Sequence, residues 1–262
     1  MNRSRFSERH TYWFVVLMEV MAILVYLLAG TVAHFMKLSN LGLYGIANLA
    51  LTILAVLIIT VMRAWKVIGF RPADKPKDLL YYIVPFLPLA INLIPGVEVS
   101  SLLGLAEVIA ITLMVGFVEE AFFRGLMLNA LKRRGLWRAA IVTSILFGLT
   151  HAMNVIAGKS VAEDMAQIFY AMAIGFAYAA LVLKKGVIWP LVLAHFLIDF
   201  TNFIQKPGFT FPPFWNLFIV ISITVIFTAY GIYVMRLKSG EKFLQPRGMD
   251  QHSDQKAYRL VS

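Results

Sequence analysis

Eight long apolar segments, separated by short polar connections, follow one another along this chain of 262 residues. An α-helix needs about 20 such residues to cross the hydrocarbon core of a bilayer. The composition agrees, because 60% of the residues are hydrophobic, 15% are charged and the mean hydropathy is +0.77. The sequence therefore predicts an all-α, polytopic membrane protein of about eight transmembrane helices, with no large soluble domain. The segments lie near 12–36, 41–62, 79–97, 101–131, 137–157, 164–183, 187–205 and 213–235.

The basic residues alternate between the connections in a way that predicts topology. Of the 24 Lys and Arg residues, 20 fall in the termini and connections that would share one side of the membrane. The opposite side holds only Lys37, Lys159 and Lys206, and Arg124 lies inside a segment. Because Lys and Arg gather in cytoplasmic loops, both termini are expected in the cytoplasm. The same bias accounts for the net charge of +10, so nucleic acid is not an expected partner.

The apolar region predicts a single domain. Residues 1–11 are expected to be a cytoplasmic N-terminus, 12–236 an eight-helix intramembrane domain, and 237–262 a polar cytoplasmic tail. The third segment should be kinked, because it contains Pro85, Pro88 and Pro95. The carbonyl groups that the prolines leave without a partner should then be satisfied by neighbouring helices.

Ionisable residues inside the segments indicate a buried polar site, since charge in lipid is costly. Counted at 1.5 Å per helical residue from the cytoplasmic boundary, the depths are about 18 Å for Glu119, 21 Å for His151, 14 Å for His195 and 20 Å for Asp199. Three separate segments thus bring two carboxylates and two imidazoles to one layer. Such an arrangement is typical of a catalytic centre.

The spacing of these residues predicts their roles. Glu120 and Arg124 are four residues apart with the acid first, the favourable order for a helical ion pair, so Arg124 is expected to be the structural counter-ion of Glu120. Glu119 points about 100° away on a helix and is left to face the histidines. His195 and Asp199 are also four residues apart and approach a common point from one helix.

Three motifs carry a family resemblance. They are Glu-Glu-x-x-x-Arg at 119–124, Phe-x-x-x-His at 147–151 and His-x-x-x-Asp at 195–199. In order and spacing they resemble those of the CAAX protease and bacteriocin-processing (CPBP, or Abi) family of intramembrane proteases, which includes the prenyl endopeptidases that trim CAAX termini. The resemblance implies an intramembrane endopeptidase with its motif core at 115–205 and with Phe147 in a supporting role. The CAAX-trimming members have Asn where this chain has Asp199.

Two versions of peptide hydrolysis fit these residues. In the first, Glu119, helped by His151, takes a proton from water, while His195 with Asp199 stabilises the oxyanion. In the second, a Zn²⁺ ion activates the water and is held by Glu119, His151, His195 and Asp199. Cysteine and serine catalysis are disfavoured, because the chain has no Cys and no Gly-x-Ser-x-Gly motif. The substrate would be a membrane-associated peptide or protein.

Two other functions use the same residues. A proton-coupled or ion-coupled transporter would also bury charges, although a conduction path would string them along the membrane normal rather than at one depth. A non-hydrolytic scaffold or bacteriocin-immunity protein could retain the protease fold without activity. An activity measurement separates this last hypothesis from a peptidase.

Overall fold

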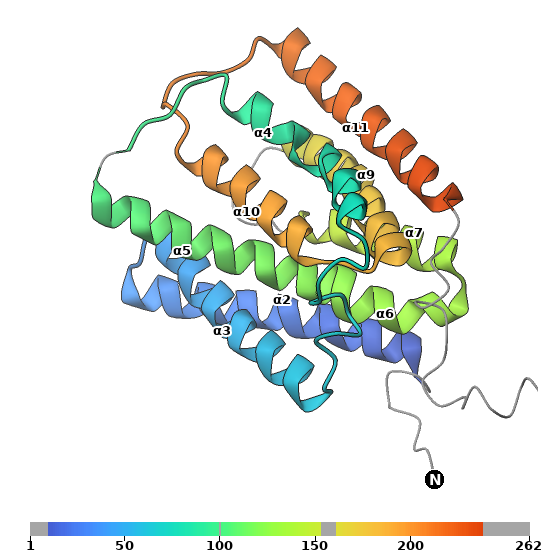
Figure 1. Ribbon diagram of the computed structural model, residues 1–262. Coiled ribbons are helices and arrows are strands. Elements are labelled where there is room, and N and C mark those ends of the chain that lie inside the picture. Colours follow the sequence, from blue (N-terminus) through green and yellow to red (C-terminus); the bar gives the residue numbers. More distant parts are fainter. Residues whose placement is uncertain (1–9, 100, 153–160, 238–262) are drawn as a thin grey trace, which may run out of the picture.

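A computed structural model describes residues 10–99, 101–152 and 161–237 (Figure 1). Within these ranges the chain is helical, apart from turns, loops and one isolated β-bridge between Val97 and Gln205. The all-α class predicted from the sequence is confirmed. The expected N-terminus and tail lie almost wholly outside the described residues, as do 153–157 of the predicted fifth segment.

Each apolar segment corresponds to helical structure in the described part of the chain. The elements are α2 (Thr11–Met36), α3 (Asn40–Val61), α4 (Leu87–Asn92), α5 (Leu102–Glu119), α6 (Leu128–Leu131), α7 (Leu136–Thr150), α9 (Val161–Lys185), α10 (Trp189–Phe203) and α11 (Pro213–Arg236). Five helical stretches in the described ranges are long and apolar enough to cross a membrane, one of them running from Leu102 to Arg134. By contrast, α7 and α10 have 15 residues each, fewer than a full span needs.

The third segment is broken, as its prolines predict. It consists of two 3₁₀ turns, Pro76–Tyr82 and Val84–Phe86, followed by the short helix α4. The hydroxyl group of Tyr178 in α9 donates a hydrogen bond to the carbonyl oxygen of Pro85 at 3.3 Å. The hydroxyl of Tyr230 in α11 donates to the carbonyl of Tyr81. Neighbouring helices therefore satisfy the backbone of this segment.

Helix α9 packs between α7 and α11 (Figure 1) and is the most buried of the five long apolar stretches. In its most apolar stretch 61% of the residues are buried, compared with 17–28% in the other four long stretches. The neighbouring helices α7 and α11 each approach α9 closely at a glycine. A Cβ atom on Gly148 of α7 would lie 2.3 Å from Met172 Cγ, and one on Gly231 of α11 would lie 2.5 Å from Phe176 Cδ1. Small residues at such crossings are typical of helix packing in membranes.

The outer surface of the long helices carries large apolar side chains. Trp13, Phe35, Val61 and Leu102 are among those that are mostly exposed. Exposed apolar surface on this scale indicates a partner or a lipid environment. It agrees with the predicted transmembrane arrangement.

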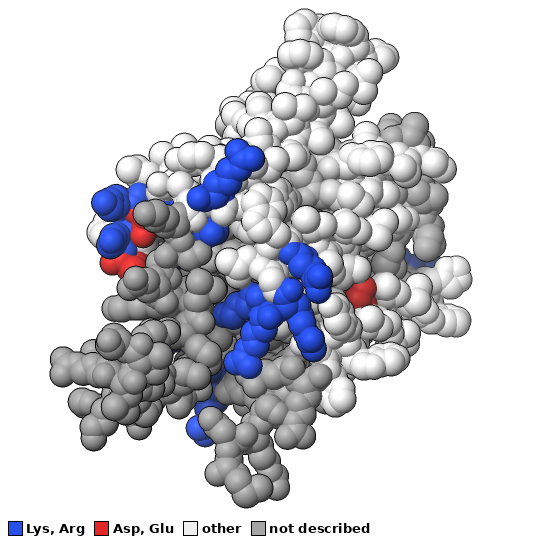
Figure 2. Space-filling view, turned by 90° about the vertical axis from the view of Figure 1, so that its right-hand side faces the viewer, with Lys and Arg blue, Asp and Glu red and all other residues white. Residues whose placement is uncertain are grey.

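Basic side chains gather at one end of the bundle (Figure 2). This end includes Lys132–Arg134, between α6 and α7, and the last turn of α9. The guanidinium group of Arg134 lies 5.7 Å from the ring of Tyr12, at the start of α2. The N-terminal helix therefore begins at the basic end of the bundle.

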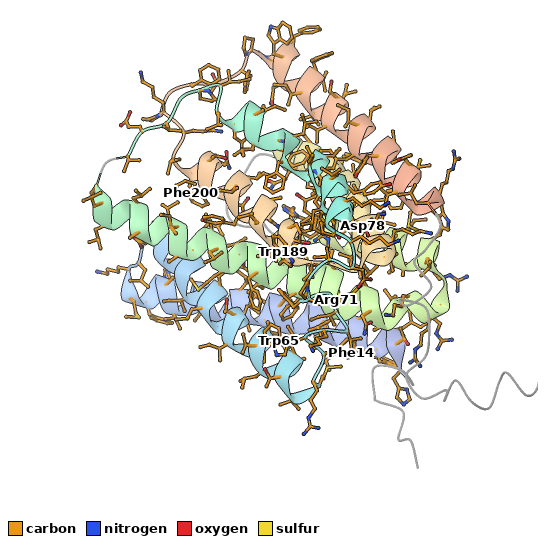
Figure 3. All side chains as sticks on the ribbon, in the orientation of Figure 1. Phe14, Trp65, Arg71, Asp78, Trp189 and Phe200 are labelled. Atoms are coloured by element: carbon orange, nitrogen blue, oxygen red, sulfur yellow. The ribbon has the colours of Figure 1, made fainter. Side chains whose placement is uncertain are left out.

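The connector between α3 and the broken segment is held at this end by long-range contacts. Arg71 Nε donates to the carbonyl of Gly186 at 3.0 Å, and the Tyr82 hydroxyl donates to the carbonyl of Val187 at 2.7 Å. The backbone N–H of Ile188 donates to the carbonyl of Gly69 at 3.0 Å. Figure 3 shows the side chain of Arg71 close to the start of α10. The turn that precedes α10 is thus fixed by residues more than 100 positions earlier.

Candidate active site

The two adjacent glutamates lie where α5 changes its helical geometry. Glu119 is the last residue of α5, and Glu120 opens a π-helical segment that ends at Met127 and is buried throughout. A π-helical stretch of this length is rare, and π-bulges frequently occur at functional sites. The sequence reading did not predict it.

A glycine brings this helix close to α10. A Cβ atom on Gly116 would lie 3.0 Å from the backbone nitrogen of Phe196 and 3.1 Å from the carbonyl oxygen of Val192. Since glycine lacks that atom, the backbones of α5 and α10 can almost touch one turn before Glu119 and Glu120. The approach brings both glutamates within reach of His195.

Glu120 contacts both His195 and Arg124 from a fully buried position. Its Oε1 atom lies 3.0 Å from His195 Nδ1 and 3.3 Å from Arg124 Nη1. The side chains of Glu120 and Arg124 are 0% and 1% exposed. The predicted ion pair is therefore confirmed. Because a carboxylate oxygen accepts, Nδ1 of His195 carries the hydrogen and donates it to Glu120.

The other ring nitrogen of His195 faces two carboxylates. Its Nε2 atom lies 3.5 Å from Glu119 Oε2 and 3.5 Å from Asp199 Oδ2. The side chain of Glu119 is 25% exposed and that of Asp199 is 29% exposed, so these two carboxylates are partly exposed, unlike Glu120. With Nδ1 already protonated, a bare Nε2 would present a lone pair to two anionic oxygens. This geometry therefore calls for a proton on Nε2 or on one of the two acids.

His151 is related to His195 by the ring of Phe147, which contacts both imidazoles. The Phe147 ring lies edge-on to the rings of both His151 and His195, with centroids 5.1 Å and 6.2 Å away. Nδ1 of His151 lies 2.9 Å from the carbonyl oxygen of Phe147. A carbonyl only accepts, so Nδ1 donates and the lone pair of His151 is on Nε2. The ring is thereby set in the tautomer that a general base needs.

The structure thus brings together Glu119, Glu120, His195 and Asp199, and the ring of Phe147 lies against both His195 and His151. The sequence pairs His195 with Asp199, and the structure adds Glu120 as a further carboxylate at the same ring. Glu120 is the nearer carboxylate and holds Nδ1, whereas Asp199 and Glu119 lie on the Nε2 side. Adjacent glutamates reach opposite edges of one imidazole because their side chains are long enough to offset the 100° between them.

The predicted zinc ligands do not form a metal-binding group. Among the described residues, no three His, Cys, Asp or Glu side chains are arranged to hold a metal ion. Glu119 and Asp199 lie near Nε2 of His195, and His151 contacts Phe147, but these four residues do not form such a group.

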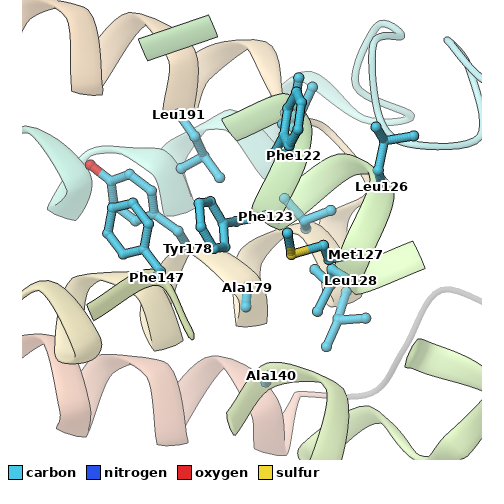
Figure 4. Close-up of a cluster of buried hydrophobic side chains, with 14 of the residues drawn as sticks. Phe122, Phe123, Leu126, Met127, Leu128, Ala140, Phe147, Tyr178, Ala179 and Leu191 are labelled. Atoms are coloured by element: carbon cyan, nitrogen blue, oxygen red, sulfur yellow. The ribbon is translucent and has the colours of Figure 1, made fainter. Parts of the chain in front are cut away.

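The surroundings of the site also include an aromatic residue of α9 that the sequence did not indicate, Tyr178. The close-up in Figure 4 shows Tyr178 beside Phe147 and near Phe123, in the buried cluster that surrounds Arg124. An aromatic residue in a transmembrane helix carries no signal of function. Only its position in space relates Tyr178 to the charges.

Comparison with known protein families gives one match. Residues 101–201, which include all three motifs, match the family described as Type II CAAX prenyl endopeptidase Rce1-like. No curated protein and no solved structure was found to match the chain. The family match confirms the resemblance to CPBP/CAAX proteases. It supports a CAAX-type intramembrane protease in general terms and, with the five apolar helical stretches, an integral membrane protein.

Proposed function

We propose that the protein is an intramembrane endopeptidase that hydrolyses a peptide bond of a membrane-associated peptide or protein by a glutamate mechanism. One observation carries the proposal. Two partly exposed carboxylates, Glu119 and Asp199, flank Nε2 of a histidine whose other nitrogen is held by a buried, ion-paired glutamate. The site therefore offers a base, an acid and a fixed imidazole at one point.

The first chemical step is attack by water. Glu119, helped by Nε2 of His151, takes a proton from a water molecule, and the resulting hydroxide attacks the carbonyl carbon of the peptide. The carbonyl double bond opens to a tetrahedral oxyanion. The proton on the Nε2 side of His195, shared with Asp199, is donated in a hydrogen bond to that oxyanion. Glu120 holds the ring in place during this step.

The second step breaks the peptide bond. The oxyanion collapses, the C–N bond breaks, and the proton taken up by Glu119 passes to the leaving nitrogen. The products are a carboxylic acid and an amine, and the side chains return to their initial state. No co-reactant besides water is consumed.

The clustering of charges favours this function over transport. Glu119, Glu120, His195 and Asp199 are linked by contacts of 3.0–3.5 Å around one ring. A conduction path would distribute ionisable groups through the depth of the membrane. In the proposed orientation both termini are cytoplasmic, residues 12–236 form one protease domain, and water reaches the site from the cytoplasm.

The decisive experiment compares two glutamates of the same helix. Glu119→Gln should retain its thermal unfolding profile, while cleavage of a membrane-associated reporter peptide by the solubilised protein falls about 100-fold to 10,000-fold, because an amide cannot accept the proton. The matched control is Glu107→Gln, since Glu107 lies on α5 and is exposed. It should cleave at the wild-type rate. Full activity in Glu119→Gln would overturn the assignment, and a wild-type protein that cleaves no reporter would favour the scaffold.

A further inference from the structure

Arg124 is a buried cation in an apolar setting. It is 1% exposed, and among the described residues its Nη1 and Nη2 atoms have no hydrogen-bond partner apart from the contact with Glu120 at 3.3 Å. Three aromatic rings surround the guanidinium group, with centroids 3.9 Å away for Phe147, 5.5 Å for Tyr178 and 5.9 Å for Phe123. Cation–π attraction is strongest where water is excluded, so these rings replace the solvation that Arg124 lacks.

Helix α9 supplies one of the rings and the space beside the cation. Tyr178 is buried, and its hydroxyl is anchored on the carbonyl of Pro85, which fixes the plane of the ring. One turn earlier, Gly175 leaves room for the guanidinium group. A Cβ atom on Gly175 would lie 3.2 Å from Arg124 Nη2 and 3.1 Å from Phe147 Cδ1. Both distances are shorter than ordinary van der Waals contact.

A continuous chain of contacts leads from this pocket to the imidazole. Arg124 contacts Glu120 Oε1, and the same oxygen accepts the hydrogen of His195 Nδ1. Displacement of the guanidinium group would therefore move the carboxylate that orients the ring. We infer that Gly175 and Tyr178, which belong to none of the three motifs, are positioning residues that set the location of His195 through Arg124 and Glu120. As a statement about catalysis, this inference rests on the proposed peptidase function.

The first test compares Gly175 and Gly231, two glycines at which an added Cβ atom would be in close contact with its neighbours. Gly175→Ala adds a methyl group against Arg124 and Phe147, whereas Gly231→Ala adds one against Phe176, between α11 and α9 and away from the charges. In Gly175→Ala the kcat of the folded protein should fall about 10-fold to 100-fold with KM changed less than twofold, because misplacement of a catalytic group by about 1 Å has effects of this size. Gly231→Ala should lower the thermal unfolding temperature at least as much but retain wild-type kcat. Equal kcat losses in the two variants would overturn the inference.

The second test separates the ring of Tyr178 from its hydroxyl. Tyr178→Phe keeps the ring over Arg124 and should retain kcat within about threefold, whereas Tyr178→Leu removes the ring and should lose about tenfold or more. A purely structural role would make kcat independent of aromaticity once the unfolded fraction is removed. Full kcat in Tyr178→Leu would contradict the assignment.

A third measurement does not depend on activity. In protein with labelled histidine, the Nδ1 proton of His195 should give a strongly downfield NMR resonance, since it is donated to a buried carboxylate, and the signal is assigned by its loss in His195→Gln. It should shift or broaden in Gly175→Ala and stay in place in Gly231→Ala. A signal unchanged in both variants would overturn the positioning inference. A wild-type protein that shows the expected NMR response but cleaves nothing would contradict only the proposed function.

Discussion

The ring of His195 is held by Glu120 through a 3.0 Å contact between Nδ1 and Oε1, and Glu120 is itself fully buried beside Arg124. The orientation of the imidazole is thus coupled to a buried ion pair rather than to an accessible carboxylate. Its Nε2 edge is left for Glu119 and Asp199. Arg124 and Glu120 therefore belong to the proposed active site although both are buried.

Glu120→Gln should cost stability as well as activity. It leaves Arg124 without its counter-ion, and breaking one side of a buried pair costs about 3–5 kcal/mol. The double variant Glu120→Gln with Arg124→Met removes both charges and should recover much of the folded protein, with activity still lost because His195 has no carboxylate at Nδ1. Thermal unfolding and peptide cleavage are measured in parallel. A double variant no more stable than Glu120→Gln alone would show that the pair is not coupled.

Asp199→Asn should remain active. The amide preserves the shape of the side chain, removes one of the two carboxylates near Nε2, and supplies a permanent N–H donor for the oxyanion. Cleavage should stay within about tenfold of wild type, whereas Asp199→Leu should lose about 100-fold to 1,000-fold, as expected for removal of an oxyanion donor. If Asp199→Leu cleaves as well as Asp199→Asn, Asp199 has no role in the reaction.

Chelation of divalent metals should leave cleavage intact. The steps of the proposed glutamate mechanism use side chains and water alone. Solubilised protein treated with 1,10-phenanthroline is assayed beside an untreated sample, and its zinc content is measured. Loss of activity that added Zn²⁺ restores would replace the glutamate mechanism by the zinc version, and His151→Ala and His195→Ala should then lower the zinc content.

Accessible tags should report two sides of the membrane. A tag within 207–212 is expected outside, and one within 72–77 or after residue 240 is expected inside, because 20 basic residues lie on one predicted side and three on the other. The measurement is labelling by a membrane-impermeant reagent in intact cells and in inverted vesicles. Labelling of 72–77 and 207–212 from the same side would contradict the topology.

Most of the fold could be predicted because lipid imposes simple rules. The long apolar runs and the distribution of Lys and Arg indicated α2, α3, α9 and α11 to within a few residues. The π-helical geometry of 120–127 could not be predicted, since it depends on how the helix is packed rather than on local residue preferences. The short length of α7 and α10 was missed for a similar reason, because apolar residues continue past the ends of both helices.

The charged part of the site could be predicted for an energetic reason. Ionisable residues in an apolar span are rare and costly, so Glu119, His195 and Asp199 stand out in the sequence. Gly175 and Tyr178 do not, because glycine and tyrosine are ordinary residues of transmembrane helices. Their relation to Arg124 exists only in three dimensions.

The hydrogen bonds that join Arg71 and Tyr82 to the turn before α10 have a consequence for biosynthesis. Arg71 emerges 115 residues before its partner Gly186, and Tyr82 emerges 105 residues before Val187. At about 5–20 residues per second, roughly 5–25 s of translation separate the partners. The polar groups of the connector have no partner in the turn before α10 during that time. We therefore expect α10 to take its final position, and His195 with it, only late in synthesis.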